Sequence, residues 1–136
     1  NAHMLIDEGV ELNGLKFYGT PWVPVISHSW AFEAEHEKLA SMFSKIPNGL
    51  DVLVTHAPPR IENEKLDVST QYYETEPFGS VELAEEILCK KPKLAFCGHI
   101  HSGAHAPTKF GNTTIVNVSR VNEDYDIAYE PYACEL

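Results

Sequence analysis

Apolar side chains form two kinds of pattern along this chain, a helical period and short continuous runs. In the segment 32–46 they return at the i, i+3, i+4, i+7 spacing of an amphipathic helix, at Leu39, Met42, Phe43 and Ile46. A second helix is predicted over 81–91, because Ser80 is a good N-cap and the apolar residues that follow it lie along one side. The remaining apolar stretches have a different pattern.

Short continuous apolar runs lie between and beyond these helices. The segments 51–56 and 93–97, with the sequences DVLVTH and KLAFC, are typical of buried strands. Asn13-Gly14 lies between two β-prone runs and is the strongest short signal for a hairpin. Further strands are predicted after the turn at Gly111-Asn112 and over 126–136. Strands interspersed with helices predict the α/β fold class, arranged as α+β layers.

The length and the cysteine content limit the kind of protein. A chain of 136 residues suits one domain. No apolar run approaches the about 20 residues that span a bilayer, and no signal-peptide pattern is seen, so a cytoplasmic protein without membrane association is predicted. Residues 1–3 are interpreted as a tag scar ahead of Met4. Cys89, Cys97 and Cys134 are predicted to be reduced and mostly buried.

The chain is strongly acidic. Twenty acidic residues against ten basic ones give a formal net charge of −10. A nucleic-acid surface needs clustered Lys and Arg, so no general nucleic-acid-binding surface is expected. A phosphate ester would need positive charge from a bound metal. The polar segment 60–79, with Tyr72 and Tyr73, is either a lid over a site or ordinary packing.

Three histidines follow the predicted strand 93–97, at His99, His101 and His105. In an extended segment residues i and i+2 point the same way, so the imidazoles of His99 and His101 can face one point. Gly98 and Gly103 allow a sharp turn and a close approach of the backbone. An H-x-H pair by itself is also typical of solvated loop histidines, and we interpret His105 as such a loop residue.

His56 follows the other predicted buried strand and precedes Pro58-Pro59. In α/β sheets, ligands collect at the carboxyl ends of the strands. If the strands 51–56 and 93–97 are neighbours, His56, His99 and His101 converge at one edge of the sheet. Neutral imidazole is a good ligand for Mn, Fe, Zn or Ni. The sequence therefore predicts a shared site for a divalent metal ion.

Two stretches carry a resemblance to a known family. VLVTHAPP and FCGHIHSG resemble the last two motifs of the calcineurin-like metallophosphoesterases, T-H-x-P-P and G-H-x-H-x-G. GLKFYGTPWVP, WAF and GSVELAEEI are similar to a subfamily of small metallophosphoesterases, and the resemblance runs from about residue 5 to about residue 119. It implies a four-layer α/β/β/α sandwich. Residues 4–136 would be its C-terminal half, mainly one mixed sheet with its flanking helices.

The resemblance also implies a site with two metal ions bridged by a carboxylate. His56 and His99 would bind one metal and His101 the other, and metal-activated water would hydrolyse a phosphate mono- or diester. The family motifs D-x-H, G-D-x-x-D and G-N-H-[DE], which supply the aspartates and the catalytic acid, do not occur here, and Asp7 and Asp51 are isolated. Three histidines without them would hold one metal ion or none.

Three functions follow as hypotheses. The first is a metal-dependent phosphoesterase acting on a small-molecule phosphate ester, incomplete in this chain. The second is a catalytically silent metal-binding or interaction fragment that needs a partner carrying the missing aspartates. The third is a purely structural domain. Because the other half of the sandwich would cover one sheet face, we expect a homodimer that buries this face.

Overall fold

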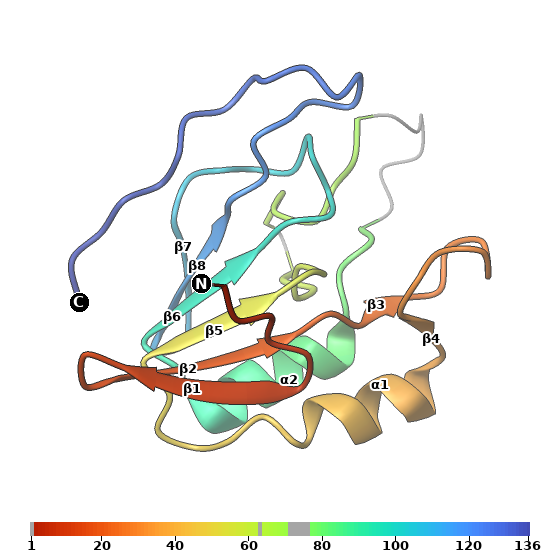
Figure 1. The fold of residues 1–136 in the computed structure, drawn as a ribbon. Helices are drawn as coiled ribbons and strands as arrows, with labels where there is room; N and C mark the ends of the chain where they lie inside the picture. The colour runs from red at the N-terminus through yellow and green to blue at the C-terminus, as the bar shows by residue number, and fades with distance from the viewer. Residues whose placement is uncertain (1, 63, 71–76) are drawn as a thin grey trace.

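The computed structural model describes residues 2–62, 64–70 and 77–136. Its main element is a six-stranded sheet with the order β1-β2-β5-β6-β8-β7 (Figure 1). The bounds of these strands are Glu8–Leu12, Leu15–Thr20, Val52–Thr55, Leu94–Cys97, Thr113–Asn117 and Thr108–Phe110, in that order. A two-stranded piece pairs β3 (Val23–Pro24) with β4 (Glu33–Ala34).

The sheet is mixed, as the fold class predicts. β2, β5, β6 and β8 run parallel, whereas β1 and β7 pair antiparallel at the two edges. The β1–β2 hairpin turns at Asn13-Gly14, where both residues have positive φ angles of 52° and 80°. The predicted strands 51–56 and 93–97 are β5 and β6, and they are direct neighbours. The carboxyl ends of the four parallel strands therefore meet at one edge.

Helices α1 (His36–Phe43) and α2 (Val81–Lys90) both lie on one face of the sheet (Figure 1). The strands present a row of buried residues to them, which are paired in register across the sheet: Tyr18, Leu53, Ala95 and Ile115. The predicted apolar stripes of both helices complete this core, with Leu39, Phe43, Leu83 and Ile87. α1 ends at Phe43, earlier than the periodic pattern, and Ile46 stays buried in the turn that follows.

The N-cap of α2 forms as predicted. The Ser80 hydroxyl accepts a hydrogen bond from the Leu83 N–H at 3.1 Å and donates to the Glu82 carboxylate at 2.7 Å. Replacing Ser80 by alanine leaves that N–H unpaired, so we expect Ser80→Ala to lower the free energy of unfolding by about 1 kcal/mol. Chemical denaturation measures this. Ser41→Ala on the exposed side of α1 is the matched control, and an equal loss there would contradict the capping role.

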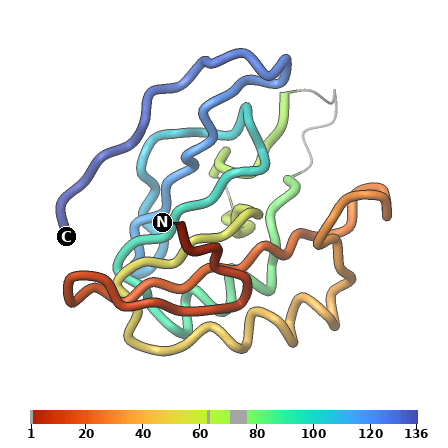
Figure 2. Tube along the Cα trace, viewed as in Figure 1, coloured from red at the N-terminus to blue at the C-terminus, as the bar shows by residue number. Residues whose placement is uncertain are grey.

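Two expectations about the chain are wrong. No strand forms over 126–136. This segment crosses the molecule as an irregular chain, with one isolated bridge between Val121 and Ile127 (Figure 2). Its acidic and aromatic residues have no alternating pattern to bury, and a strand needs such a face. Cys97 is buried, but Cys89 and Cys134 are exposed, because the first lies on the solvent side of α2 and the second in the irregular C-terminal segment.

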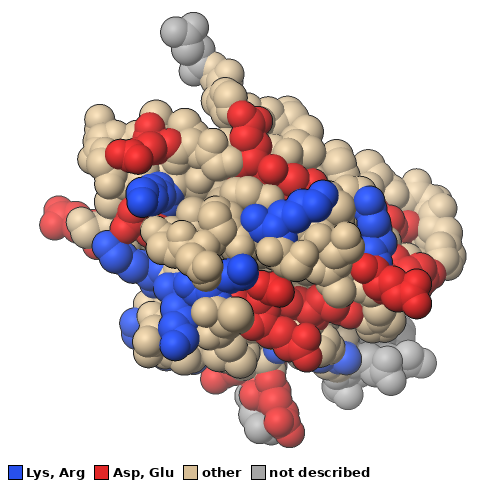
Figure 3. Space-filling model, turned by 90° about the horizontal axis from the view of Figure 1, so that it is seen from below, with Lys and Arg blue, Asp and Glu red and all other residues tan. Residues whose placement is uncertain are grey.

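The surface carries side chains of both charges. On the face viewed in Figure 3, Lys and Arg side chains are interspersed with Asp and Glu. Among the described residues, no helix is long and apolar enough to cross a membrane. Tyr72 and Tyr73 of the candidate lid lie outside the described residues.

Candidate metal centre

The site is built where the parallel strands β5 and β6 end. His56 follows the last residue of β5, and Gly98 and His99 follow the last residue of β6. The sheet register continues one step beyond both strands, because the Gly98 N–H donates to the His56 carbonyl at 3.1 Å. The imidazole rings of His56 and His99 consequently lie with their centroids 4.8 Å apart. The predicted convergence of these two histidines is confirmed.

His99 has an unusual backbone. Its φ angle is +66°, and the Ile100 N–H donates to the Gly98 carbonyl at 2.7 Å, which closes a three-residue γ-turn centred on His99. A non-glycine residue with positive φ is held there only by the surrounding structure, and such residues cluster at functional sites. In this turn the His99 ring lies beside the ring of His56.

One nitrogen of the His99 ring makes no hydrogen bond within the described part of the chain. Nε2 of His99 is buried from solvent and has no hydrogen-bond partner among the described residues. A buried polar atom without a partner costs about 1–3 kcal/mol, so such atoms are uncommon and call for an explanation. An imidazole nitrogen can also satisfy its lone pair by binding a metal ion. His99 Nε2 is therefore the strongest single indication of a ligand.

His56 and His99 are held in the uncharged form, because their pKa values are lowered. Burial, and then the nearby His56 and His101, lower the pKa of His99 to about 4. Burial, and then His101, lower the pKa of His56 as well. A ring that stays neutral near pH 7 keeps a nitrogen lone pair available, which is the form in which histidine binds metals. Mutual repulsion between the rings is the electrostatic sign of three imidazoles that share one pocket.

The His101 ring is oriented by a backbone carbonyl. Its Nδ1 lies 3.0 Å from the carbonyl oxygen of Asn122, and its ring meets Tyr125 edge-on with centroids 5.3 Å apart. Because a carbonyl only accepts, Nδ1 of the neutral ring carries the proton and Nε2 keeps the lone pair. Metal-binding histidines are commonly oriented in this way, with the second ring nitrogen donating to a carbonyl.

All three histidines line one pocket of about 640 Å³. The other side chains around it include Trp30, Phe32, Glu123 and Tyr125. Within the ranges that the structure describes, no group of three or more His, Cys, Asp or Glu residues is arranged to hold a metal ion. The donor chemistry and the unpartnered His99 nitrogen fit a divalent metal, but the three rings do not form a ready-made ligand shell. The assignment of His56, His99 and His101 as ligands stays a prediction.

Glu123 is a pocket residue that the sequence did not reveal. Its Oε1 accepts hydrogen bonds from the Ser102 N–H at 3.2 Å, from the Ser102 hydroxyl and from the Ser69 hydroxyl at 3.2 Å. Glu123 thereby ties the irregular C-terminal segment to the loop that carries His101. No short motif marks it, since it lies in a stretch of several acidic residues without a period.

His105 has a different environment from the solvated loop that the sequence suggests. Its Nδ1 lies 3.1 Å from the Asn117 carbonyl, its Nε2 lies 2.9 Å from the His101 carbonyl, and its ring stacks on Tyr129 at 3.6 Å. Both nitrogens contact backbone oxygens, so neither is directed at the pocket. His105 braces the H-x-H loop against the C-terminal segment.

Asp7 and Asp51 form their side-chain contacts with residues other than the histidines. Asp7 accepts hydrogen bonds from the Thr20 hydroxyl at 2.7 Å and from the Trp22 indole N–H at 2.8 Å. Asp51 accepts from the Lys16 N–H at 2.8 Å and pairs with Lys93 at 2.7 Å. Asp51 precedes β5, at the end of the strand opposite His56, as predicted.

Comparison with known proteins identifies relatives along the whole chain. A UPF0046 protein of Caenorhabditis elegans is 35% identical over 138 residues, which cover 100% of this chain and 33% of that protein. Metallophosphoesterase domain-containing protein 1 of Homo sapiens is 31% identical over 138 residues, which cover 100% of this chain and 40% of that protein. The chain is a relative of the calcineurin-like metallophosphoesterases, as its motifs predict. It spans less than half the length of these two relatives.

A solved crystal structure shares the fold. It superposes with a TM-score of 0.63 at 19% identity, over 85% of this chain and 45% of that chain. At this level of identity the likeness shows a common α/β fold and nothing about activity. No family model matches the chain.

The lowered histidine pKa values predict how stability depends on pH without metal. Between pH 6.5 and about 4 an unfolded imidazole is protonated while folded His99 is not, so the unfolded state binds more protons. With EDTA present, we expect the free energy of unfolding to rise with pH through this window and to fall as the solution is acidified. Urea denaturation at a series of pH values measures it. His99→Asn should make the free energy of unfolding depend less on pH in this window. An unchanged slope in that variant would refute the lowered pKa of His99 as the cause.

Proposed function

We propose that the chain carries the histidine part of a metal-dependent phosphoesterase site, in which His56, His99 and His101 bind a divalent ion such as Mn²⁺, Fe²⁺, Zn²⁺ or Ni²⁺. The unpartnered, buried Nε2 of His99, in a pocket that His56 and His101 also line, is the observation that supports this most. The name of the human relative, metallophosphoesterase domain-containing protein 1, points to the same class of hydrolase.

Each part of the chain has a separable role in this proposal. A bound divalent ion would supply positive charge and lower the pKa of a coordinated water, which this acidic chain does not do with its own side chains. His99 and His56 would present neutral nitrogens, and the Asn122 carbonyl would hold His101 in the tautomer whose Nε2 can bind. The aromatic side chains around the pocket would limit access of bulk water to a bound phosphate ester.

A second candidate is a metal-binding fragment without activity of its own, which would acquire carboxylate ligands from a partner. Glu123 is the one carboxylate among the described residues that line this pocket, and its Oε1 is already engaged by Ser102 and Ser69. A two-metal site needs an anionic bridge to offset the repulsion between the ions. The pocket composition therefore favours a single ion in this chain and leaves the bridge to another source.

Metal analysis combined with turnover separates these functions. The protein would be purified without chelator and its metal content measured. Hydrolysis of 4-nitrophenyl phosphate and bis(4-nitrophenyl) phosphate would then be followed with Mn²⁺, Fe²⁺, Zn²⁺ or Ni²⁺ added singly. Turnover that requires metal and stops with EDTA supports the phosphoesterase. Bound metal without turnover supports the silent fragment. Absence of both would leave a structural domain and refute the metal site.

We also propose that the sheet face opposite the helices is covered by a second copy of the chain. Val54 is 39% exposed on this face, and its register partner Phe96 contacts the Tyr132 ring of the C-terminal segment edge-on. Exposed apolar surface favours association. Sedimentation should show a concentration-dependent dimer that Val54→Glu weakens. Leu12→Glu, at the β1–β2 turn, is the control. A monomer at high concentration would refute the dimer.

A further inference from the structure

The loop between β3 and β4 has a strained backbone. It joins Pro24 to Glu33, and two of its non-glycine residues, His28 and Phe32, have left-handed φ angles of 57° and 63°. Each such conformation costs of order 1–3 kcal/mol and persists only where other contacts enforce it. The loop must therefore be fixed by something other than its own backbone preference.

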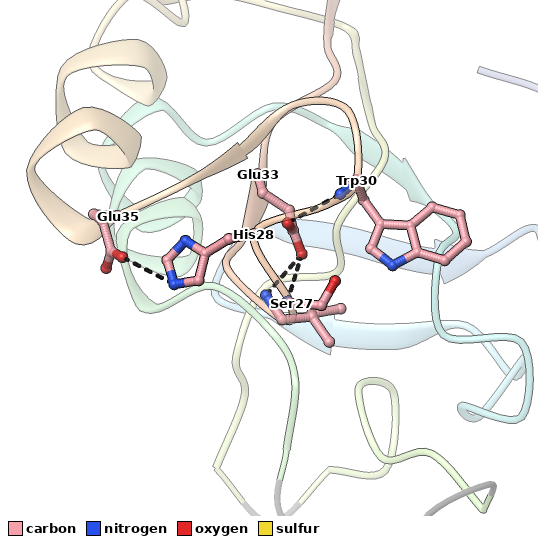
Figure 4. Close-up of polar contacts among 6 residues, drawn as sticks. Ser27, His28, Trp30, Glu33 and Glu35 are labelled. Atoms are coloured by element: carbon pink, nitrogen blue, oxygen red, sulfur yellow. Dashed lines mark hydrogen bonds and ion pairs between the residues drawn. The ribbon is translucent and has the colours of Figure 1, made fainter.

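A single carboxylate supplies the fixing contacts (Figure 4). Oε1 of Glu33 accepts hydrogen bonds from the N–H groups of Ile26 at 2.8 Å and Ser27 at 2.9 Å, and Oε2 accepts from the Trp30 N–H at 3.1 Å. Hydrogen bonds to an ionised acceptor are roughly twice as strong as those between neutral groups. Burial acts to raise the pKa of Glu33, but the surrounding backbone N–H groups outweigh it and lower this pKa, so the carboxylate stays charged at neutral pH.

One of the three residues whose N–H groups this carboxylate holds, Trp30, lines the histidine pocket. Trp30 and Phe32 both line it, although their exposed fractions are 68% and 40%. Phe32 is braced from behind by an edge-on contact with Trp22, at 5.6 Å between ring centroids. Trp22 is itself fixed by its hydrogen bond to Asp7 and by Lys38, whose Nζ lies 5.0 Å from the ring centroid. Trp22 thus supports Phe32, whereas Trp30 is held through its backbone by Glu33.

A third aromatic residue, Tyr125, lines the same pocket. Tyr125 is 72% exposed, has a φ angle of +65°, and contacts His101 edge-on. Large aromatic side chains that stay exposed around a pocket offer π-faces to a ligand, since flat rings pack on them with a gain of about 0.5–1.5 kcal/mol beyond burial. The histidines and the aromatic residues are therefore parts of one recess, one polar and the other apolar.

We propose that Glu33 is a positioning residue, which clamps residues 26–30 so that Trp30 and Phe32 form an aromatic wall selecting phosphate esters with a planar aromatic group. The clamp stands on the geometry alone, whereas the phosphate part of the ligand rests on the proposed function. A wall of this kind does not discriminate among phosphate groups. It discriminates by what is attached to the phosphate.

The clamp is tested by amide hydrogen exchange on the metal-free full chain. Glu33→Gln keeps the size of the side chain but offers one neutral acceptor oxygen in place of two charged ones. We expect the amides of Ile26, Ser27 and Trp30 to exchange at least about tenfold faster, as loss of one charge-assisted hydrogen bond implies. Glu35→Gln is the matched control, because the Glu35 carboxylate pairs with the His28 ring of the same loop at 3.9 Å but accepts no backbone N–H among the described residues. Unchanged exchange in Glu33→Gln overturns the clamp.

The wall is tested by binding of two phosphonates that resist hydrolysis, phenylphosphonate and methylphosphonate, with Mn²⁺ present. Calorimetry should show that the wild-type chain binds the phenyl compound at least about fivefold more tightly, as stacking of one ring implies. Glu33→Gln and Trp30→Ala should remove this preference, and Glu35→Gln should keep it. Equal binding of the two compounds by the wild type overturns the wall and leaves the proposed function intact.

The clamp by Glu33 and the binding of a phosphate ester can be refuted separately. If neither phosphonate binds, the proposed function and the phosphate part of this inference are wrong, and amide exchange still decides the clamp. If Glu33→Gln speeds exchange but leaves the phenyl preference unchanged, Glu33 is only a structural residue and its positioning role is overturned. If Trp30→Ala alone loses the preference, the wall is supported and its dependence on Glu33 is refuted.

Discussion

Replacing His99 by asparagine is expected to abolish metal binding while leaving the fold in place. Asparagine tolerates the left-handed backbone that the γ-turn requires at this position, where φ is +66°. The variant removes the imidazole that contacts His56 and carries the unpartnered Nε2. Even residues that only orient metal ligands change affinity by 10–100-fold, so we expect loss of a ligand to weaken binding by at least about 100-fold.

The stability of the metal-free protein should change little in this variant. Removing a buried nitrogen without a partner is favourable, and this offsets the lost packing of the ring, so we expect a change in the free energy of unfolding within about 1 kcal/mol. Metal should then stabilise only the wild type, by about 2.7 kcal/mol at 100 times the dissociation constant. His28→Asn, at another positive-φ histidine that lies outside the pocket residues, is the matched control. Equal stabilisation of His99→Asn by metal would refute the ligand role.

The sequence predicts the parts of the site that depend on strand pattern. Apolar runs locate β5 and β6, and each run ends one or two residues before a histidine. Because parallel neighbours end at the same edge, the approach of His56 to His99 follows from the pattern and one pairing assumption. The core faces of α1 and α2 are predicted equally well, since the 3.6-residue period is a local signal.

The features that the sequence missed depend on contacts between distant segments. Glu123 reaches Ser102 across 21 positions, and Asp7 reaches Trp22 across 15. Neither residue belongs to a periodic pattern or a turn signature. The aromatic wall was missed for another reason, because an exposed Trp30 reveals its role only when the loop that carries it is placed beside the histidines.

The glycines of the H-x-H loop were expected for their backbone freedom, and the structure gives a different reason. Neither Gly98 nor Gly103 has a positive φ angle, and His99 itself adopts the left-handed conformation of the turn. Gly103 is needed because no space remains for a side chain. A Cβ atom there would lie 2.0 Å from the Leu66 carbonyl oxygen and 3.1 Å from Nδ2 of Asn117.

This crowding makes Gly103→Ala the substitution with the largest expected effect on stability. The clash is with backbone, and Leu66 is fully buried in the core, so neither side can yield cheaply. Overpacking of a tight interior costs typically 1–3 kcal/mol and occasionally more, and we expect a loss of at least about 3 kcal/mol in the free energy of unfolding. The loop would also move, because the hydrogen bond from Gly103 N–H to the Ile100 carbonyl and that from Ala104 N–H to the Lys65 carbonyl flank the clash.

Gly98→Ala separates crowding from any general intolerance of the loop. A Cβ at Gly98 would meet the Ser119 hydroxyl oxygen at 3.5 Å and the His56 carbonyl oxygen at 4.0 Å, which are ordinary contacts. We expect thermal denaturation to shift little for Gly98→Ala and by about 10 °C for Gly103→Ala, given a few degrees per kcal/mol for a domain of this size. Similar shifts in both variants would contradict the crowding. A larger shift at Gly103 means that the close approach of residue 66 to the loop, and not the flexibility of glycine, excludes a side chain at this position.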